Sequence, residues 1–198
     1  MKIFVTAILL SAGKSTRMGS SKALLDWEGI PLVKYQIHNL INGGVSQVIV
    51  VLGYNHQEIS EYICEPSVKF LINYEYNEGK VTSILKGLLA VPEGSSDIMI
   101  LSVDQPRSHQ IIDRLIKNHL DSKSLISIPS NGSKSGHPII FSGKLKPKLL
   151  EISESSKGLK ALVNKYRNDL NFVDFQNEMI FLDINTPQEY FLSKGKLY

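Results

Sequence analysis

Residues 3–22, which read IFVTAILLSAGKSTRMGSSK, are the stretch of sequence that decides the fold. Its first part, residues 3–10, is apolar and rich in β-branched side chains, which predicts a buried strand. The small residues Ser-Ala-Gly follow at positions 11–13 and leave their backbone N–H groups open to a ligand. Arg17 and Lys22 then add positive charge that suits a polyphosphate. The stretch therefore predicts a strand that leads into a phosphate-binding loop, and an ordinary Gly/Ser turn with surface cations is the alternative.

Two common nucleotide-binding motifs do not fit this loop. Gly13-Lys14-Ser15 ends like a P-loop, but the spacing G-x-x-x-x-G-K-S/T requires a glycine at position 8, where the chain has Ile8. The dinucleotide fingerprint G-x-G-x-x-G also fails, because a serine and not a glycine stands two residues after Gly13. The loop is therefore neither a Walker motif nor a dinucleotide fingerprint.

The rest of the chain alternates short β-branched runs with helical patterns, which predicts an α/β fold. Most of the runs are apolar on both faces, as in strands that helices cover on both sides, so we expect a three-layer α/β/α sandwich around a mostly parallel sheet. A length of 198 residues, 42% of them hydrophobic, predicts a single domain over residues 1–198. The predicted strands are 3–10, 47–52, 68–72, 98–103, 125–129, 138–141 and 179–183. The predicted helices are 32–41, 57–64, 82–91, 110–120, 158–166 and one that starts at Pro187.

Aspartates follow two of the predicted strands, at the edge where open α/β sheets bind their ligands. Asp104 comes directly after the strand 98–103, and Asp183 closes the strand 179–183. Mg²⁺ prefers one or two carboxylates together with phosphate oxygens and water, so we expect both side chains to hold one such ion against a nucleoside triphosphate. The alternatives are a turn aspartate for Asp104 and a helix N-cap for Asp183.

Four motifs, in order along residues 3–190, resemble those of a known enzyme family. From Leu10 to Lys22 the chain reads L-x-A-G-x-S-x-R-M-G-x-x-K, which resembles the signature of nucleotidyltransferases that load an NMP onto a phosphorylated acceptor. The later motifs resemble those of molybdenum-cofactor cytidylyltransferases, and they read Asn77-Glu78-Gly79-(x)3-Ser83, Asp104-Gln105-Pro106 with Gly136-His137-Pro138, and Leu182-Asp183-Ile184-Asn185-Thr186-Pro187.

This resemblance implies a fold, a reaction and roles for single residues. The fold is the Rossmann-like sandwich of the nucleotide-diphospho-sugar transferases, and the reaction transfers CMP from CTP to the terminal phosphate of a molybdopterin-type acceptor. Lys22 is expected near the α-phosphate and Arg17 near the leaving phosphates, with Asp104 as the third catalytic residue and Gly136-His137-Pro138 on the acceptor side. The expected nucleotide-binding residues are Leu10, Ser11, Ala12, Gly13, Lys14, Arg17, Lys22, Asn77, Gly79 and Ser83.

The implied roles have alternatives. Lys22 also fits a solvated lysine at a helix start, Ser83 fits a helix N-cap, and a lone histidine such as His137 is usually structural or solvated. GTP as the donor and a sugar phosphate or choline phosphate as the acceptor stay open. A different class of protein would hold the cofactor without catalysis, for delivery to a molybdenum hydroxylase.

Three positions bear on how far the resemblance carries. Ser11 stands where alanine is common in the family, and Asn185 replaces a frequent acid. Guanylyltransferases of this group tend to have a second glycine at the position of Ala12, so the alanine favours cytosine as the base.

Composition limits the remaining function classes. A net charge of +3 allows an anionic small-molecule substrate but lacks the dense basic clusters of a nucleic-acid-binding protein. The single cysteine, Cys64, excludes an internal disulfide and a cysteine-based zinc cluster, which favours a reducing cytoplasm. No stretch approaches the roughly 20 apolar residues of a membrane span, so no membrane partner is expected. Residues 131–136 are predicted to form a mobile exposed loop that shapes the acceptor site.

Overall fold

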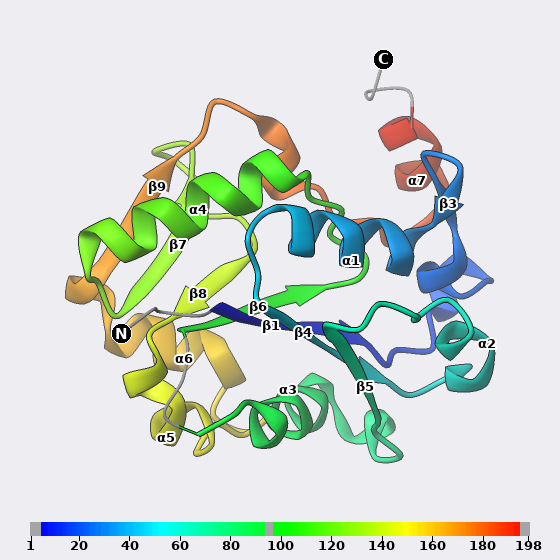
Figure 1. The fold of residues 1–198 in the computed structure, drawn as a ribbon, viewed down its shortest axis with the longest axis horizontal. Coiled ribbons are helices and arrows are strands. Elements are labelled where there is room, and N and C mark those ends of the chain that lie inside the picture. The colour runs from blue at the N-terminus through cyan, green and yellow to red at the C-terminus, as the bar shows by residue number, and fades with distance from the viewer. Residues whose placement is uncertain (1–4, 94–96, 195–198) are drawn as a thin grey trace.

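A computed structural model of the chain describes residues 5–93 and 97–194, and its centre is a seven-stranded sheet (Figure 1). The strands lie in the order β5-β4-β1-β6-β8-β7-β9, and every neighbouring pair is parallel except the two that include β8. The predicted α/β class and the mostly parallel sheet are therefore confirmed. The bounds are β1 Val5–Ser11, β4 Gln47–Leu52, β5 Val68–Ile72, β6 Asp97–Ser102, β7 Ile126–Ser130, β8 Ile139–Phe141 and β9 Leu170–Asp174.

Helices cover both faces of the sheet, and β1 shows the reason. Ala7 and Leu9 belong to a hydrophobic cluster with helices α1 and α4, whereas Ile8 and Leu10 belong to a second cluster with α3, α5 and α6. Successive side chains of a strand point to opposite faces, so an apolar strand must be covered on both sides. The three-layer sandwich is therefore confirmed, and Figure 1 shows the two helical layers above and below the sheet. The helices are α1 Leu32–Asn42, α3 Lys80–Ala90, α4 His109–Ser122, α5 Lys146–Leu149 and α6 Gly158–Lys165.

Smaller elements connect these layers. A two-stranded hairpin of β2 and β3 follows the first loop, and two short helices, α2 and α7, lie toward the same side of the molecule in Figure 1. Their bounds are β2 Asp26–Trp27, β3 Ile30–Pro31, α2 His56–Ser60 and α7 Pro187–Lys194. Single 3₁₀ turns are η1 Thr16–Met18, η2 Lys22–Leu24, η3 Tyr76–Glu78, η4 Gly143–Leu145, η5 Arg167–Asp169 and η6 Glu178–Phe181.

The predicted strands are present within two residues of their predicted ends, except the one predicted at 179–183. Residues 3 and 4 of the first predicted strand lie outside the described residues. The predicted helices are also present, although α2 ends four residues before the predicted helix 57–64 does. No helix among the described residues has the length and apolar character needed to cross a membrane.

The prediction of a last strand at 179–183 is wrong. These residues form the turn η6 and an extended segment, and the carbonyls of Ile180 and Leu182 accept hydrogen bonds from the Arg107 guanidinium and not from a strand. The edge strand of this side is β9, which the sequence analysis missed. Its sequence, LNFVD, mixes polar and apolar side chains and has only Val173 buried, so it lacks the apolar run that marks the central strands. Asp183 therefore does not close a strand.

Helix α3 lies unusually close to β1, and this placement builds one wall of the site. A Cβ added at Gly87 would lie 2.5 Å from Cγ2 of Ile8, so only glycine allows the helix to approach the strand this closely. The first turn of α3 and the loop after β1 consequently line the same cavity.

Candidate functional site

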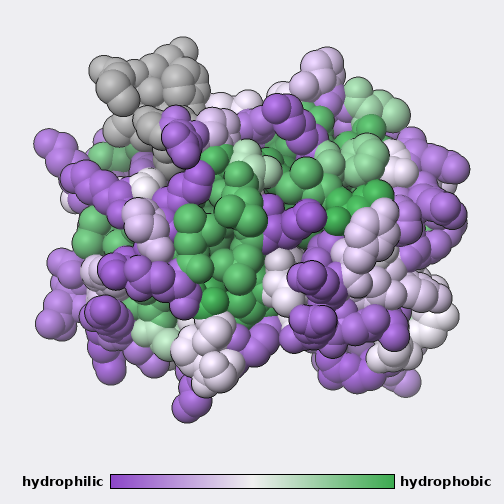
Figure 2. Space-filling model, turned by 90° about the horizontal axis from the view of Figure 1, so that it is seen from below, coloured by the Kyte–Doolittle hydropathy of each residue, from purple (hydrophilic) through white to green (hydrophobic). Residues whose placement is uncertain are grey.

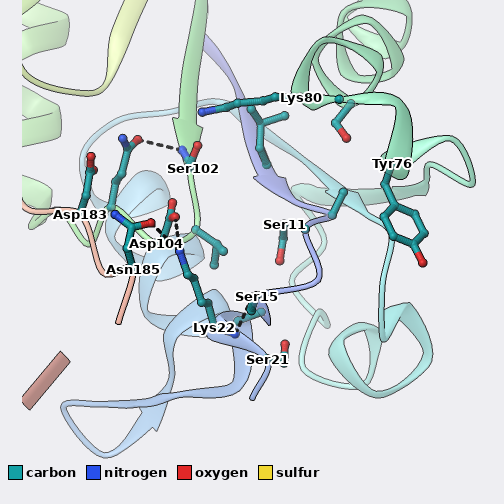
Figure 3. Close-up of a pocket in the computed structure, with 18 of the residues that line it drawn as sticks. Ser11, Ser15, Ser21, Lys22, Tyr76, Lys80, Ser102, Asp104, Asp183 and Asn185 are labelled. Atoms are coloured by element: carbon teal, nitrogen blue, oxygen red, sulfur yellow. Dashed lines mark hydrogen bonds and ion pairs between the residues drawn. The ribbon is translucent and has the colours of Figure 1, made fainter. Parts of the chain in front are cut away.

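A cavity of about 470 Å³ opens at the carboxyl ends of β1 and β6 (Figure 3). Four segments line it: the loop after β1, the loop after β6, the residues around the start of α3, and residues 183–185. Parallel strands end at one edge of a sheet, so segments that are far apart in the sequence converge there. Of the predicted site residues, the cavity is lined by Leu10, Ser11, Ala12, Gly13, Lys22, Asn77, Gly79, Ser83, Asp104 and Asp183.

Five predicted residues do not line the cavity. Lys14 and Arg17 are partly or fully exposed in the loop after β1, where Lys14 lies 6.0 Å from the centre of the Tyr76 ring and Arg17 Nη2 donates to Asn185 Oδ1 at 3.3 Å. The tripeptide Gly136-His137-Pro138 lies behind the segment 180–183. The structure therefore brings ten of the predicted site residues to one cavity and leaves the other five outside its walls.

The best-defined interaction in the cavity joins Lys22 to Asp104. Lys22 Nζ donates to Asp104 Oδ2 at 2.8 Å and to Asn185 Oδ1 at 2.9 Å. The lysine side chain is 12% exposed and the aspartate side chain 24% exposed. Lys22 begins the turn η2, and its backbone N–H donates to Ser15 Oγ, which fixes the start of that turn. The ammonium group is therefore oriented by two partners, and the alternative of a freely solvated lysine is wrong.

Asp104 and Asp183 are held next to each other by the backbone. The N–H of Ile184 donates to the carbonyl of Asp104 at 2.8 Å, so the carboxylates extend from two adjoining segments into one cavity. The N-cap alternative for Asp183 is wrong: at the start of α7, Glu189 N–H donates to Thr186 Oγ1, and the Glu189 carboxylate accepts from Thr186 N–H. This is a capping box that does not use Asp183.

The residues present fit a divalent metal that prefers oxygen ligands. Among residues 5–93 and 97–194, no group of three or more His, Cys, Asp or Glu side chains could hold a metal by itself. Two carboxylates on one cavity wall, with the remaining positions left to phosphate oxygens and water, are nevertheless the arrangement that Mg²⁺ or Mn²⁺ uses with nucleotide substrates. Asp104 and Asp183 would hold such an ion.

Arg107 is the main functional residue that the sequence analysis missed. Its side chain is buried, and its guanidinium donates to the carbonyls of Pro106, His137, Ile180 and Leu182 at 2.8–2.9 Å. Burial lowers the pKa of Arg107 to about 10, while the charges of Asp183 and Asp104 oppose the shift, so the group stays protonated at neutral pH. One arginine thus fixes the segment of Asp183 and that of His137 to the loop after β6. The signal in the sequence was its position next to Asp104-Gln105-Pro106.

Gln36 fixes the other side of the same loop. It is fully buried in α1, its Nε2 donates to the carbonyl of Gln105, and its Oε1 accepts from Arg107 N–H. A buried glutamine on an otherwise apolar helix face was the sequence signal for this contact. Asp104 is therefore placed by a hydrogen-bonded loop and not by chance proximity.

Two serine hydroxyls that line the cavity, those of Ser11 and Ser83, have hydrogen-bonding positions that no residue occupies in the described part of the chain. Ser11 Oγ is buried and has no partner in the described part of the chain. Ser83 Oγ accepts from Asn73 Nδ2 at 3.0 Å, and its own proton stays available to a ligand. The N-cap position of α3 is Gly79, so the alternative of Ser83 as an N-cap is wrong. A buried polar atom without a partner is uncommon, and the Ser11 hydroxyl lines the cavity, where it is open to a ligand.

The tripeptide Gly136-His137-Pro138 is anchored through its backbone. A Cβ at Gly136 would lie 2.3 Å from the carbonyl oxygen of Ile180, and the His137 N–H donates to that same oxygen at 3.1 Å. Burial and, to a smaller extent, the charge of Lys80 lower the pKa of His137 to about 4 against the opposing charge of Asp183, so the imidazole is neutral at pH 7. The preceding residues 131–135 are largely exposed as expected, but they form a turn in which Asn131 Oδ1 accepts from two backbone N–H groups.

Known proteins resemble this chain over nearly its whole length. The chain is 26% identical to the nicotine blue oxidoreductase of Paenarthrobacter nicotinovorans, covering 94% of this chain and 95% of that one. It is 27% identical to the molybdenum cofactor cytidylyltransferase of Escherichia coli K12, covering 97% and 96%. Rv0371c from Mycobacterium tuberculosis superposes with a TM-score of 0.84 over 98% of both chains at 21% identity, and that protein has also been solved in complex with manganese.

A protein-family model, that of the MobA-like NTP transferase domain, matches residues 7–170 of the chain. These residues include three segments that line the cavity: the loop after β1, the start of α3 and the loop that holds Asp104. Relatives and structural neighbours include nucleotidyltransferases, in agreement with the seven-stranded sheet and the position of the cavity. The chain belongs to the family of the MobA-like NTP transferase domain and is a nucleotidyltransferase.

Proposed function

We propose that this nucleotidyltransferase moves CMP from CTP to the terminal phosphate of a molybdopterin-type acceptor and releases pyrophosphate. The observation that carries the proposal is Lys22, held 2.8 Å from Asp104 and 2.9 Å from Asn185 in the cavity at the end of β1. A cation oriented in this way stabilises charge on a phosphoryl group without any reorganisation during the reaction. The full-length similarity to a molybdenum cofactor cytidylyltransferase supports the acceptor class and CTP.

The reaction needs positioning and charge neutralisation more than covalent chemistry. An oxygen of the acceptor phosphate attacks the α-phosphorus in line, the bond to the β-phosphate oxygen breaks, and pyrophosphate leaves with the bonding electron pair. Lys22 neutralises charge at the α-phosphate. Arg17 is exposed and its side chain makes one long hydrogen bond, to Asn185, so it is able to reach the leaving phosphates. A Mg²⁺ ion held by Asp104 and Asp183 would neutralise phosphate charge when bound. No residue needs to form a covalent intermediate.

The base and ribose fit the wall formed by the loop after β1 and the start of α3. Backbone groups of residues 10–13 are reachable because Ala12 and Gly13 carry almost no side chain. The hydroxyls of Ser11 and Ser83 provide further hydrogen-bond groups there. A pyrimidine is smaller than a purine and leaves space for the methyl group of Ala12. This agrees with an alanine at the position where guanylyltransferases of this group tend to have a second glycine.

The oxidoreductase among the relatives shows why the site must carry this assignment. One fold supports unrelated reactions, so the family alone does not fix the chemistry of each member. The paired carboxylates and the oriented lysine favour phosphoryl transfer over hydride transfer. Pyrophosphate release also separates an enzyme from a protein that only holds the cofactor for a molybdenum hydroxylase, which we propose as the recipient of the product in the cytoplasm.

The decisive experiment tests donors and acceptors together. Each of the four NTPs is incubated with the protein, Mg²⁺ and either molybdopterin, glucose 1-phosphate or phosphocholine, and pyrophosphate is measured. We expect release with CTP and molybdopterin at least tenfold above every other pair. Release with GTP or with a sugar phosphate instead would reject the proposed donor or acceptor, and no release with any pair would reject catalysis of this type.

A further inference from the structure

A second lysine, Lys80, reaches the cavity from the first turn of α3 and is not among the site residues predicted from the sequence. It follows Gly79 directly and lines the cavity together with Lys22, Asp104 and Asp183. Figure 3 shows its side chain extended along the edge of the cavity away from α3, on the side opposite Lys22. The cavity therefore has a cation on two of its walls.

The two lysines differ in what they contact. Lys22 Nζ is engaged by Asp104 and Asn185. The Lys80 side chain forms no hydrogen bond or ion pair with any residue in 5–93 or 97–194, although it lines a cavity that contains two aspartates. A cation that lies in a substrate cavity and has no partner of its own is available to an anionic group of the substrate.

The backbone around Lys80 is fixed, so the fold sets the position from which its side chain extends. Gly79 has a φ of 123°, which favours glycine, and a Cβ there would lie 2.2 Å from Oε1 of Glu154. The same Glu154 oxygen accepts the N–H of Val81 at 2.7 Å, the residue after Lys80. Glu154 thus satisfies the start of α3 and holds the first turn in place.

Lys80 also lies on the acceptor side of the cavity. Its positive charge acts on the imidazole of His137, where it helps to keep the pKa low. The His137 backbone N–H donates to the carbonyl of Ile180, and Asp183, at the end of the same segment 180–183, lines the cavity. The nucleotide phosphates, by contrast, are expected at Lys22 and Arg17.

We propose that Lys80 binds the phosphate group of the acceptor and orients its attacking oxygen, so that it is a specificity-determining residue for the second substrate. This inference rests on the proposed function. The acceptor phosphate carries about two negative charges at pH 7 and approaches a nucleotide that is itself anionic. Lys80 offsets this repulsion from the acceptor side, while Lys22 and the metal act on the nucleotide side. Its ammonium group donates hydrogen bonds and takes no part in bond making or breaking.

The test uses Lys80→Met, which keeps the length of the side chain and removes the charge. Lys86→Met is the matched control, because Lys86 is an exposed lysine on the same helix that does not line the cavity. We expect Lys80→Met to raise the KM for molybdopterin by about tenfold or more, since a hydrogen bond between two charged groups is lost. The Kd for CTP with Mg²⁺ should stay within twofold, Lys80→Arg should keep most of the acceptor affinity, and Lys86→Met should resemble the wild type. Weaker CTP binding with an unchanged acceptor KM, or no change in either, would overturn the proposal.

A second measurement does not depend on the identity of the acceptor. Inorganic phosphate is titrated into the wild type, Lys80→Met and Lys86→Met, and the imidazole resonances of His137 are followed by NMR. We expect a saturable shift in the wild type and in Lys86→Met, and an at least fivefold weaker response in Lys80→Met. If the donor and acceptor screen fails but this difference is seen, Lys80 binds phosphate and only the proposed reaction is wrong. Equal responses in all three proteins would reject the role of Lys80.

Discussion

An aspartate lies beside a basic side chain near each end of β6, and the two pairs differ in how open they are. At the amino end, Asp97 Oδ2 lies 3.4 Å from His119 Nε2, and the other ring nitrogen of His119 contacts Ser127 Oγ at 2.7 Å. Just beyond the carboxyl end, Asp104 pairs with Lys22. The His119 side chain is 2% exposed and the Asp97 side chain 14% exposed, whereas Asp104 opens onto a cavity and is 24% exposed.

The difference shows what makes a charged pair functional. Around Asp97 the neighbours are complete, because Gly143 N–H donates to its other oxygen and Asn171 donates to Ser127. Although aspartate, histidine and serine are close together, His119 and Ser127 are buried and none of the three lines the cavity that Asp104 faces. Asp104 keeps free oxygen lone pairs that face open space. Carboxylate oxygens that face a cavity at the carboxyl end of the sheet, and not the residue types alone, distinguish Asp104 from Asp97.

Asp104→Asn should have the largest effect on activity and break the carboxyl end alone. We expect turnover to fall by about 10²–10³ or more, because one carboxylate of the metal pair and the partner of Lys22 are lost together. Circular dichroism and the melting temperature should change little, since the side chain is partly exposed. Turnover and Mg²⁺ dependence are measured with the donor and acceptor found in the screen.

Asp97→Asn is the matched change at the amino end of the same strand. It should lower the free energy of unfolding by roughly 1–3 kcal/mol, because a buried histidine loses a charged partner. Turnover per folded molecule should equal that of the wild type. A wild-type rate and Mg²⁺ response in Asp104→Asn, or a catalytic defect confined to Asp97→Asn, would reverse the comparison.

Lys22 and Arg17, the cations of the loop after β1, sharpen the comparison at the carboxyl end of the sheet. Lys22→Ala should reduce turnover by about 10²–10³, because it removes an oriented charge. Arg17→Ala should cost less, since Arg17 is exposed and its contact to Asn185 is 3.3 Å long. Turnover and CTP affinity are measured separately for each variant. Unchanged turnover in both would return the loop to an ordinary turn.

The pH dependence of stability should separate the two ends in a different way. Burial alone would raise the pKa of Asp97, but its hydrogen bonds from His119 and Gly143 outweigh this and lower it, so its contribution is present above about pH 4 and is lost as the pH falls further. The pKa of His137 is lowered to about 4, so its contribution is present above pH 6.5 and is lost between pH 6.5 and 4, up to about 3 kcal/mol.

Melting curves of the wild type, His137→Gln and Asp97→Asn from pH 7.5 to 2.5 measure these contributions. His137→Gln should flatten the curve between pH 6.5 and 4, and Asp97→Asn should flatten it below pH 4. Identical pH profiles in all three proteins would show that neither pKa is shifted.

The smallest effect is expected from His137→Ala on substrate binding. We predict a rise of a few fold in the acceptor KM, with CTP affinity within about twofold of the wild type, because binding of one substrate can be weakened without changing the other. CTP is titrated calorimetrically and the acceptor is varied in the pyrophosphate assay. A variant with weaker CTP binding would place His137 on the nucleotide side, and a variant with only a lower melting temperature would make it structural.

Several features were predictable from the sequence because each depends on local pattern. The apolar run before Ser11 predicted β1, and the small residues and cations after it predicted the loop that now lines the cavity. Asp104 was predictable as a site residue because it directly follows a strand-like run. The segment 179–183 was not, since its apolar residues have the composition of a strand but give their carbonyls to a distant arginine.

The sequence by itself determined the α/β class, the loop of small residues after β1 and which segments hold acidic residues. Only the tertiary structure decided which charges meet and which stay free. Lys22 and Lys80 have the same side chain, yet the convergence of loops from residues 104 and 185 pairs one of them and leaves the other open. The reason is that pairing of charges depends on distances of a few ångströms between segments far apart in the chain, and local sequence pattern does not encode those distances.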